Sequence, residues 1–250
     1  MISHFSSDEK VEIIKEDIRT LDKSIIKGID AVVDMALLFN DLSGDLNPEL
    51  TLSISYKGSV RIAKMAKESG INKYILMSSC SVYGFRDDIA DEDREPNPLT
   101  TYAKANIFAE REVLTLSSEG FHPTAIRLST VFDPSKRMRF DILVNGMALN
   151  AYIEGKISMM KDGTQKRALV HVFNVAREIY KTLQANDEVS GEIINVCHED
   201  LNYRVMDVAG IVKKKSPAGK LQCTETRTQD HMRLNLKRQG KCLILCPCLM

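Results

Sequence analysis

The sequence has no net charge and no long apolar run, and these two absences limit what the chain can bind. Its 34 basic residues balance 34 acidic ones, whereas nucleic-acid-binding proteins usually carry a basic excess or patch. No apolar run is long enough to cross a bilayer. The first residues, MISHFSSDEKVEIIKED, lack the basic and apolar regions of a secretory signal. We therefore expect a cytoplasmic protein whose partners include neither nucleic acid nor membrane.

Motifs that would mark a nucleotide, zinc or serine-hydrolase site are also missing. The two closest of the 13 glycines, Gly155 and Gly163, lie eight residues apart, so no glycine-rich turn is available to approach a pyrophosphate. The chain has no H-E-x-x-H, C-x-x-C or G-x-S-x-G motif. Cys242, Cys246 and Cys248 crowd the C-terminus, but their spacing fits no common zinc pattern. We expect free thiols and no metal site.

What the sequence does contain is an alternation of apolar and amphipathic segments. Strands are predicted at 31–39, 72–79 and 123–132, and helices at 48–70 and 100–120 lie between them. A strand-helix-strand order of this kind indicates a parallel sheet with right-handed crossovers. The predicted fold class is therefore α/β.

Beyond about residue 135 the predicted segments are shorter and more mixed. An Asp-Gly pair inside 157–172 predicts two short strands around a tight turn. Around them we predict helices at 139–156, 171–186 and 203–215 and a strand at 191–197. This part of the chain is expected to form a smaller lobe beside the parallel sheet.

Five stretches of sequence carry a family likeness. In chain order they are EDIRT (16–20), VVDMALL (32–38), LMSSCSVYG (76–84), NPLTTYAKANIFAE (97–110) and RALVHVFNVARE (167–178). The third is similar to S-S-x-x-V-Y-G, and the fourth to P-x-x-x-Y-x-x-x-K-x-x-x-E. With them the chain resembles the extended short-chain dehydrogenase/reductases, in the NAD-dependent epimerase/dehydratase branch that acts on nucleotide sugars. The resemblance spans roughly residues 11–213.

The resemblance implies a division of the chain into two lobes. Residues 1–135 would form a Rossmann-like NAD(P)-binding domain whose first βαβ unit, with its glycine turn, is largely missing at the N-terminus. Residues 136–215 would form a smaller mixed α/β substrate lobe, with some crossing of the chain between lobes, and 216–250 is a tail with no assigned structure. In the family, helices like 48–70 and 100–120 pair across a two-fold axis, which makes a homodimer possible.

The resemblance also assigns the catalytic and substrate-binding residues. Tyr102 would be the acid/base that exchanges a proton with the sugar hydroxyl as the cofactor oxidises it, and Ser79 would hydrogen-bond the same oxygen. Ser79 ends a predicted strand, where open α/β sheets place their ligands. Arg167 would bind a substrate phosphate, although a surface strand residue is the alternative that the resemblance favours slightly less.

The cofactor, NAD or NADP, would be held by residues of the first lobe. The family's adenine contact corresponds to Asp17 and Ile18, although Asp17 could be a plain helix-start acid. The strand end that passes the cofactor corresponds to a run of three residues. This run is Met35, Ala36 and Leu37. Tyr102 and Asn106 complete the predicted cofactor-binding set.

One departure from the family pattern falls at the residue that would lower the pKa of the catalytic tyrosine. A free tyrosine has a pKa near 10, and the family lowers it with a lysine four residues after the tyrosine, where this chain has Asn106. Asn106 can bond a ribose hydroxyl but supplies no charge. Lys104 lies two residues after Tyr102, about 200° around a helix, and so faces the other way.

Three interpretations remain open. The chain is either an epimerase- or dehydratase-type oxidoreductase of nucleotide sugars, or a truncated or non-catalytic relative with a binding or dimerisation role. The ordered motifs favour the first, and the absent glycine turn together with Asn106 favours the second. A reductase of small carbonyls on the same fold ranks below both, because it would need a smaller second lobe.

Overall fold

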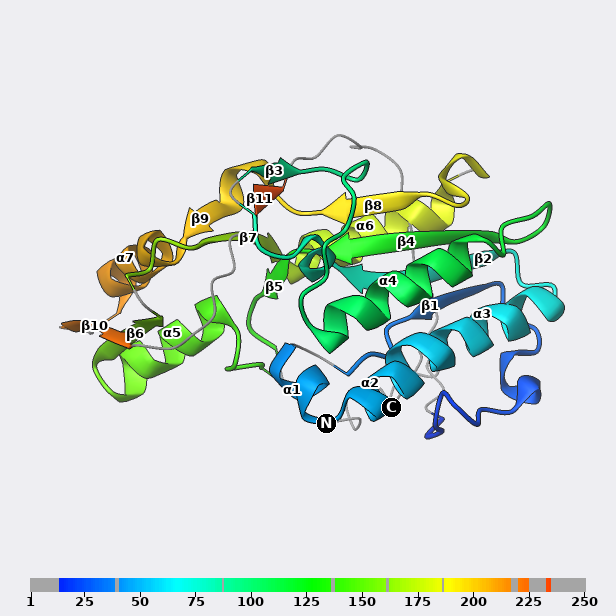
Figure 1. Ribbon diagram of the computed structural model, residues 1–250, viewed down its shortest axis with the longest axis horizontal. Helices are drawn as coiled ribbons and strands as arrows, with labels where there is room; N and C mark the ends of the chain where they lie inside the picture. The colour runs from blue at the N-terminus through cyan, green and yellow to red at the C-terminus, as the bar shows by residue number, and fades with distance from the viewer. Residues whose placement is uncertain are drawn as a thin grey trace.

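A four-stranded parallel sheet forms the centre of the larger lobe (Figure 1). The computed structural model describes residues 14–38, 41–86, 88–135, 138–160, 162–185, 187–216, 220–224 and 233–234. Among these residues the sheet runs in the order β1 (Ala31–Asp34), β2 (Lys73–Ser79), β4 (His122–Leu128) and β8 (Ile193–Val196), with every neighbouring pair parallel. The central pair, β2 and β4, is in register over its full length, from Lys73 opposite His122 to Ser79 opposite Leu128.

Helices cover both faces of this sheet. One face carries α1 (Asp41–Leu46), α2 (Pro48–Leu52), α3 (Ser59–Glu68) and α4 (Thr101–Leu114), and a π-helical turn (Ser53–Gly58) joins α2 to α3. The other face carries α6 (Val172–Gln184).

The alternation of side chains along β2 separates the two cores. Tyr74 and Leu76 are buried with residues of α3 and α4, such as Ala63. Ile75 and Met77 point to the opposite face and are buried with residues of α6.

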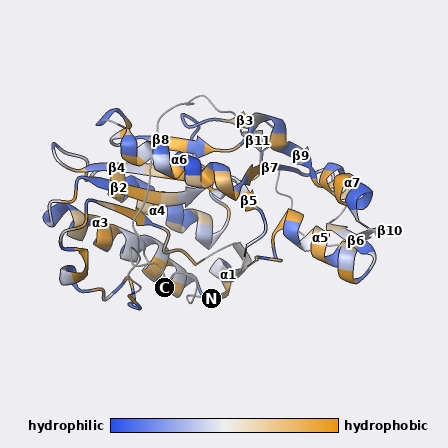
Figure 2. Cartoon of the chain, turned by 180° about the vertical axis from the view of Figure 1, so that it is seen from behind, coloured by the Kyte–Doolittle hydropathy of each residue, from blue (hydrophilic) through white to orange (hydrophobic). Residues whose placement is uncertain are grey.

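The smaller lobe is built from short strands and two helices. Strand β7 (Lys166–His171) lies between β5 (Thr130–Phe132), which is parallel to it, and β9 (Asn202–Arg204), which is antiparallel. The remaining elements are α5 (Leu143–Ile153), α7 (Val205–Lys215), β6 (Lys156–Met160) paired with β10 (Lys220–Thr224), and β3 (Ile89–Ala90) paired with β11 (Arg233–Leu234). In Figure 2 hydrophobic and hydrophilic residues both occur along α3 and α7, as expected of helices with one buried face.

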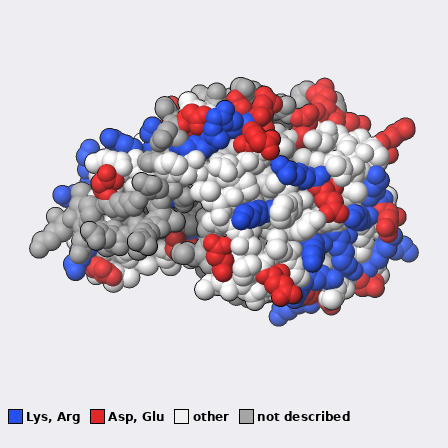
Figure 3. Space-filling model, viewed as in Figure 1, with Lys and Arg blue, Asp and Glu red and all other residues white. Residues whose placement is uncertain are grey.

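Four short 3-10 helices complete the described elements. They are Lys23–Ile26, Cys80–Tyr83, Asp187–Val189 and Glu199–Leu201. Within the described ranges no helix is both long and apolar enough to span a bilayer. On the face of the molecule in Figure 3, acidic and basic side chains are interspersed.

The predicted α/β class is confirmed, and so is the parallel order of its first three strands. The predicted helix at 100–120 ends earlier than expected, at Leu114, and a bridge between Ser118 and Phe121 closes the turn that follows. The predicted strand at 123–132 is divided after Leu128. The Ser129 N–H still bonds the Val196 carbonyl of β8, at 3.1 Å, and the chain then pairs with β7 from Thr130 onward.

The two short strands predicted around the Asp-Gly turn are confirmed as β6 and β7. They do not pair with each other, because β6 pairs with β10 and β7 pairs with β5 and β9. The reason lies in the turn, whose carbonyls bond the start of α7 instead. The Met206 N–H donates to the Gly163 carbonyl at 2.9 Å, and the Val205 N–H to the Gln165 carbonyl at 3.0 Å.

Chain order and lobe do not coincide after β7. Helix α6 and strand β8 fall inside the range predicted for the substrate lobe, yet both pack with the main sheet. A crossing between lobes was expected, and the division at residue 135 remains a prediction. The terminal cysteines Cys242, Cys246 and Cys248 lie outside the described residues, as does the start of the chain up to residue 13.

A buried carboxyl in β1 gives the fold a pH-dependent element. Asp34 is 1% exposed, accepts a 2.7 Å bond from the Tyr74 hydroxyl and accepts the Ala36 N–H at 3.0 Å. Burial raises its pKa above the ordinary 3.8 despite these bonds. Folding therefore favours the protonated carboxyl, and this contribution is lost as pH rises from 3.8 through the folded-state pKa.

We predict that Asp34→Asn gains stability relative to the wild type as the pH rises from about 4.5 to 8, because the amide never has to ionise in the core. Urea unfolding at several pH values measures this difference. The control is Asp207→Asn, since Asp207 pairs with Arg204, which lowers its pKa, so the carboxyl is ionised across that range. A difference for Asp34→Asn that stays flat with pH would contradict the prediction.

Candidate active site

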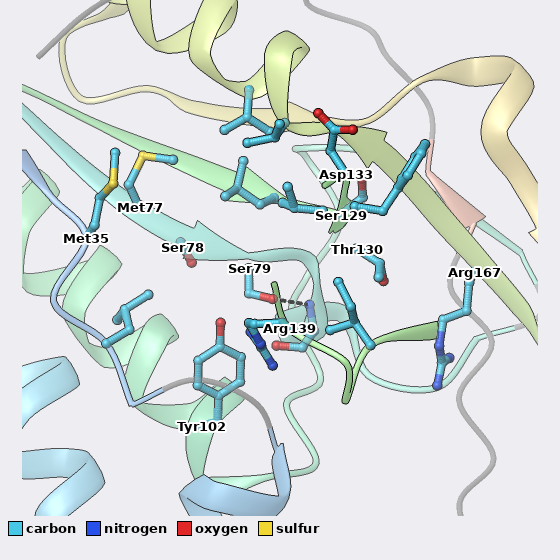
Figure 4. A pocket seen from close by; sticks show the side chains of 18 of the residues that line it. Met35, Met77, Ser78, Ser79, Tyr102, Ser129, Thr130, Asp133, Arg139 and Arg167 are labelled. Atoms are coloured by element: carbon cyan, nitrogen blue, oxygen red, sulfur yellow. Dashed lines mark hydrogen bonds between the residues drawn. The ribbon is translucent and has the colours of Figure 1, made fainter. Parts of the chain in front are cut away.

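A cavity of about 590 Å³ opens at the carboxyl ends of β1, β2 and β4 (Figure 4). Its remaining walls come from the start of α4, the segment after β4, the start of α5, strand β7 and one side of α6. Open α/β sheets bind their ligands in this place, because the loops that follow the strands diverge there.

Ser79 stands at the end of β2 and lines the cavity. Its hydroxyl caps the short helix that follows, by accepting the Ser81 N–H at 3.2 Å. The neighbouring residue, Ser78, is 2% exposed and its hydroxyl donates to Glu110 at 2.5 Å. Ser79 is therefore presented to the cavity, whereas Ser78 links β2 to α4 through its bond to Glu110.

Tyr102 lies in the first turn of α4 and also lines the cavity. Two contacts fix the start of this helix: the Thr100 hydroxyl accepts the Ala103 N–H at 3.2 Å, and the Asp45 carboxylate accepts the Thr101 N–H at 2.9 Å. Gly44 of α1 packs so closely that a Cβ there would lie 2.9 Å from the Cβ of Tyr102. These contacts fix the backbone and the Cβ of Tyr102 at the edge of the cavity.

An ion pair buried behind the two serines joins α4 to β4. The side chains of Arg127 and Glu110 are 3% and 2% exposed, and they meet in a fork, with Nη2 to Oε2 at 2.6 Å and Nε to Oε1 at 3.0 Å. Burial alone would lower the pKa of Arg127, but its bonds to Glu110 and the charge of that carboxylate outweigh burial and raise it.

The network continues from Arg127 toward β8. Its Nη1 donates to the Tyr83 hydroxyl at 2.8 Å, and that hydroxyl donates to Asn195 Oδ1 at 2.9 Å. Burial raises the pKa of Tyr83 above its ordinary value, so this tyrosine stays a neutral donor. Three strands and α4 are thus tied together beneath the cavity floor.

Of the residues predicted for the site, five line the cavity. They are Ser79, Tyr102, Met35, Leu37 and Arg167. Figure 4 shows Arg167 on the far side of the cavity from Met35, so this space extends from the first lobe to the second.

The other four predicted residues do not line it. Asn106 is 1% exposed, and its amide donates to the Tyr102 backbone carbonyl at 2.9 Å. Ile18 and Ala36 are buried in the core under α3. Asp17 is at the surface, where a fork with Arg19 lowers its pKa to about 2. Their roles as cofactor ligands remain predictions.

Several lining residues carry polar or charged groups that sequence reasoning missed. The hydroxyls of Ser81 and Ser129 are buried, and within the described structure neither has a hydrogen-bond partner. Asp133 pairs with His171, Oδ2 to Nε2 at 3.2 Å, at the start of α6. Arg139 belongs to a basic run at 136–139 that resembles a solvated loop, and no sequence signal would have placed it here.

The family follows from a direct comparison with known proteins. The sequence profile of the NAD dependent epimerase/dehydratase family matches residues 3–197 of the 250 in the chain. The chain belongs to the NAD-dependent epimerase/dehydratase family. The family inferred from the five motifs is therefore confirmed.

Individual curated proteins are similar to the chain at low identity. UDP-glucuronate 4-epimerase of Thermodesulfobacterium geofontis is 26% identical over 170 residues, which are 67% of this chain and 51% of that protein. Human sterol-4-alpha-carboxylate 3-dehydrogenase is 26% identical over 184 residues, 70% of this chain and 48% of that protein. The chain thus spans about half the length of these curated relatives.

A solved relative shows the same fold. UDP-glucuronic acid 4-epimerase of Bacillus cereus, in complex with UDP-glucuronic acid and NAD, has a TM-score of 0.85 and 19% identity. The match covers 94% of this chain and 76% of that one. At this identity the likeness supports the fold and leaves the ligand to be argued from the residues of this chain.

Breaking the buried ion pair should lower the free energy of unfolding, and the costs of removing its two partners should not add. We predict that Arg127→Met lowers the free energy of unfolding by about 3–5 kcal/mol, because it leaves the Glu110 carboxylate buried without a counter-charge. Adding Glu110→Gln should recover part of that loss, so the two costs fall short of additivity by about 0.5–3 kcal/mol. Urea unfolding of both single variants and the double variant measures this coupling.

A matched control uses a surface pair. Arg111 and Glu95 meet at 3.2 Å with side chains 65% and 84% exposed, so Arg111→Met should change stability little. Strictly additive costs at Arg127 and Glu110 would mean that the buried pair is not a unit.

Proposed function

We propose that this chain binds NAD and carries out the redox step of an epimerase- or dehydratase-type reaction on a nucleotide sugar. The observation that carries the proposal is the meeting of Ser79 and Tyr102 on one cavity at the carboxyl ends of the strands. The family membership and the relatives named for UDP-sugars support the same choice.

The residues present fit the nicotinamide end of this cofactor better than its adenine end. Met35, Leu37 and Met77 give the cavity an apolar wall beside the strand ends, against which the flat face of a nicotinamide ring can pack. The residues predicted for the adenine, Asp17 and Ile18, are committed to a surface ion pair and to the core. Bound there, NAD would supply the acceptor for the two electrons that leave the sugar carbon as a hydride.

The chain's own residues would handle the proton. Tyr102 would take it from the sugar hydroxyl as the carbon is oxidised to a ketone, and would return it on reduction. Ser79 would hold the same oxygen, because its hydroxyl can donate while it still accepts the Ser81 N–H. In the resting structure the Ser79 cap fixes where that oxygen must lie.

Arg167 bears on the substrate class. Its guanidinium enters the cavity from the side opposite Met35 and suits the phosphates of a nucleotide. The ring body of a sterol, the substrate class in the name of the human relative, carries no such group.

Cofactor binding is tested by calorimetric titration with NAD and NADP. We expect Met35→Asp to weaken NAD binding roughly tenfold, about 1.4 kcal/mol, because it removes the apolar surface against which the ring packs and requires a carboxylate to lose its water there. Met206→Asp on α7 is the matched control, since Met206 is 40% exposed, like Met35 at 41%, and lies off the cavity. No binding by the wild type at millimolar cofactor, or equal loss in both variants, would contradict the proposal.

A non-catalytic role in binding or dimerisation is the alternative, and Asn106 in place of the family's lysine favours it. Conversion of UDP-glucuronic acid and UDP-glucose to an epimerised or dehydrated product, followed by chromatography of the sugar nucleotides, separates the two, because NAD is regenerated in each turnover. If the chain is an enzyme, Tyr102→Phe abolishes turnover and Asn106→Lys raises it. The control Lys104→Met leaves it unchanged, because Lys104 is exposed and does not line the cavity. Turnover that survives Tyr102→Phe would remove the tyrosine from the mechanism.

A further inference from the structure

A tyrosine that acts as a base near neutral pH needs a positive charge close to its hydroxyl, because the free phenol has a pKa near 10. In this chain the position that would supply it holds Asn106, whose amide is buried and bonded to the backbone of Tyr102. Lys104 is exposed on the other side of α4. Among the described residues that line the cavity there is no lysine.

The charged groups of the cavity wall are Asp133, Arg139 and Arg167. Figure 4 shows Tyr102 and the guanidinium of Arg139 reaching into the same part of the cavity, near Ser79, while Arg167 enters from the opposite side. Asp133 is engaged with His171 at 3.2 Å. Of the two cations, Arg139 is therefore the one placed to act on the tyrosine.

Arg139 is held in position by its own counter-ion. Asp141 accepts its Nε at 3.1 Å and its Nη2 at 2.5 Å, a fork that fixes the plane of the guanidinium. The Asp141 carboxylate offsets part of the positive field, and so does exposure, since the two side chains are 37% and 48% exposed. A further carboxylate, Asp45 of α1, faces the backbone at the start of α4.

We propose that Arg139, contributed by the segment between β5 and α5, is the cation that favours the ionised form of Tyr102 in place of the lysine absent at position 106. The inference rests on the proposed function, because only an acid/base role gives the tyrosine a use for this charge. The positive charge near the Tyr102 hydroxyl would thus come from a loop of the second lobe and not from α4. Because the charge is attached to a loop, the ionisation of Tyr102 depends on how that loop is seated on the cavity.

The test follows the ionisation of Tyr102 in the full chain without ligand. With tyrosine labelled with ¹³C at Cζ, NMR resolves the seven tyrosines of the chain, and Tyr102→Phe assigns the signal. We expect Arg139→Gln to raise the titration midpoint of Tyr102 by about one pH unit and Arg139→Lys to leave it near the wild-type value.

Controls separate a charge effect from a structural one. Lys104→Met, which removes an equal charge from the exposed side of the same helix, should leave the midpoint unchanged. A midpoint unchanged in Arg139→Gln, or shifted equally by Arg139→Gln and Arg139→Lys, would overturn the proposal. Because no cofactor or turnover enters this titration, its failure is distinct from a failure to bind NAD.

Discussion

The buried pair between Glu110 and Arg127 is the interaction on which the site depends. Glu110 belongs to α4, Arg127 to β4, and the same carboxylate accepts the Ser78 hydroxyl at the end of β2. A charge buried this deeply tolerates no loss of its partner, so the helix and the two strands hold one relative position. That position brings Tyr102, eight residues before Glu110, to the cavity that Ser79 also lines.

The site is consequently supported unevenly. The proposed reacting pair, Ser79 and Tyr102, is held by the fork beneath it, the cap at Ser79 and the close approach of Gly44 to Tyr102. Of the charged lining residues, Arg167 lies in strand β7, whereas Asp133 and Arg139 lie in the segment between β5 and α5. The proposed pair therefore lies on regular elements, while two of the three charges lie on a connecting segment.

The sequence predicted the larger lobe well because its signals are local. Apolar runs such as 72–79 and helix caps are read within a few residues, and the S-S-x-x-V-Y-G and Tyr motifs lie at strand and helix ends that the sheet brings together. Pairing in the smaller lobe could not be predicted, since β6 meets a strand some 60 residues later and the turn at Gly163 bonds α7. Such choices depend on partners distant in the sequence.

The charged residues of the site show the same limit. Glu110 keeps the family spacing from Tyr102, but nothing in the sequence announces its fork with Arg127 or the buried depth of that pair. The sequence shows that Asn106 stands where the family has a lysine. Only the structure shows that its amide bonds the backbone of the helix and does not line the cavity. Conversely, the sequence of the basic run at 136–139 is typical of a solvated loop, and only the structure shows that Arg139 lines the cavity.

Amide hydrogen exchange tests the central claim most directly, that one buried ion pair holds the helix of Tyr102 against the strands. Exchange in the wild type would be compared with that in Glu110→Gln, which keeps the shape of the side chain and removes its charge. We predict faster exchange in the first turns of α4 and along β4, with α5 and α7 of the smaller lobe unchanged. Unchanged protection of α4, or a uniform acceleration through both lobes, would contradict it.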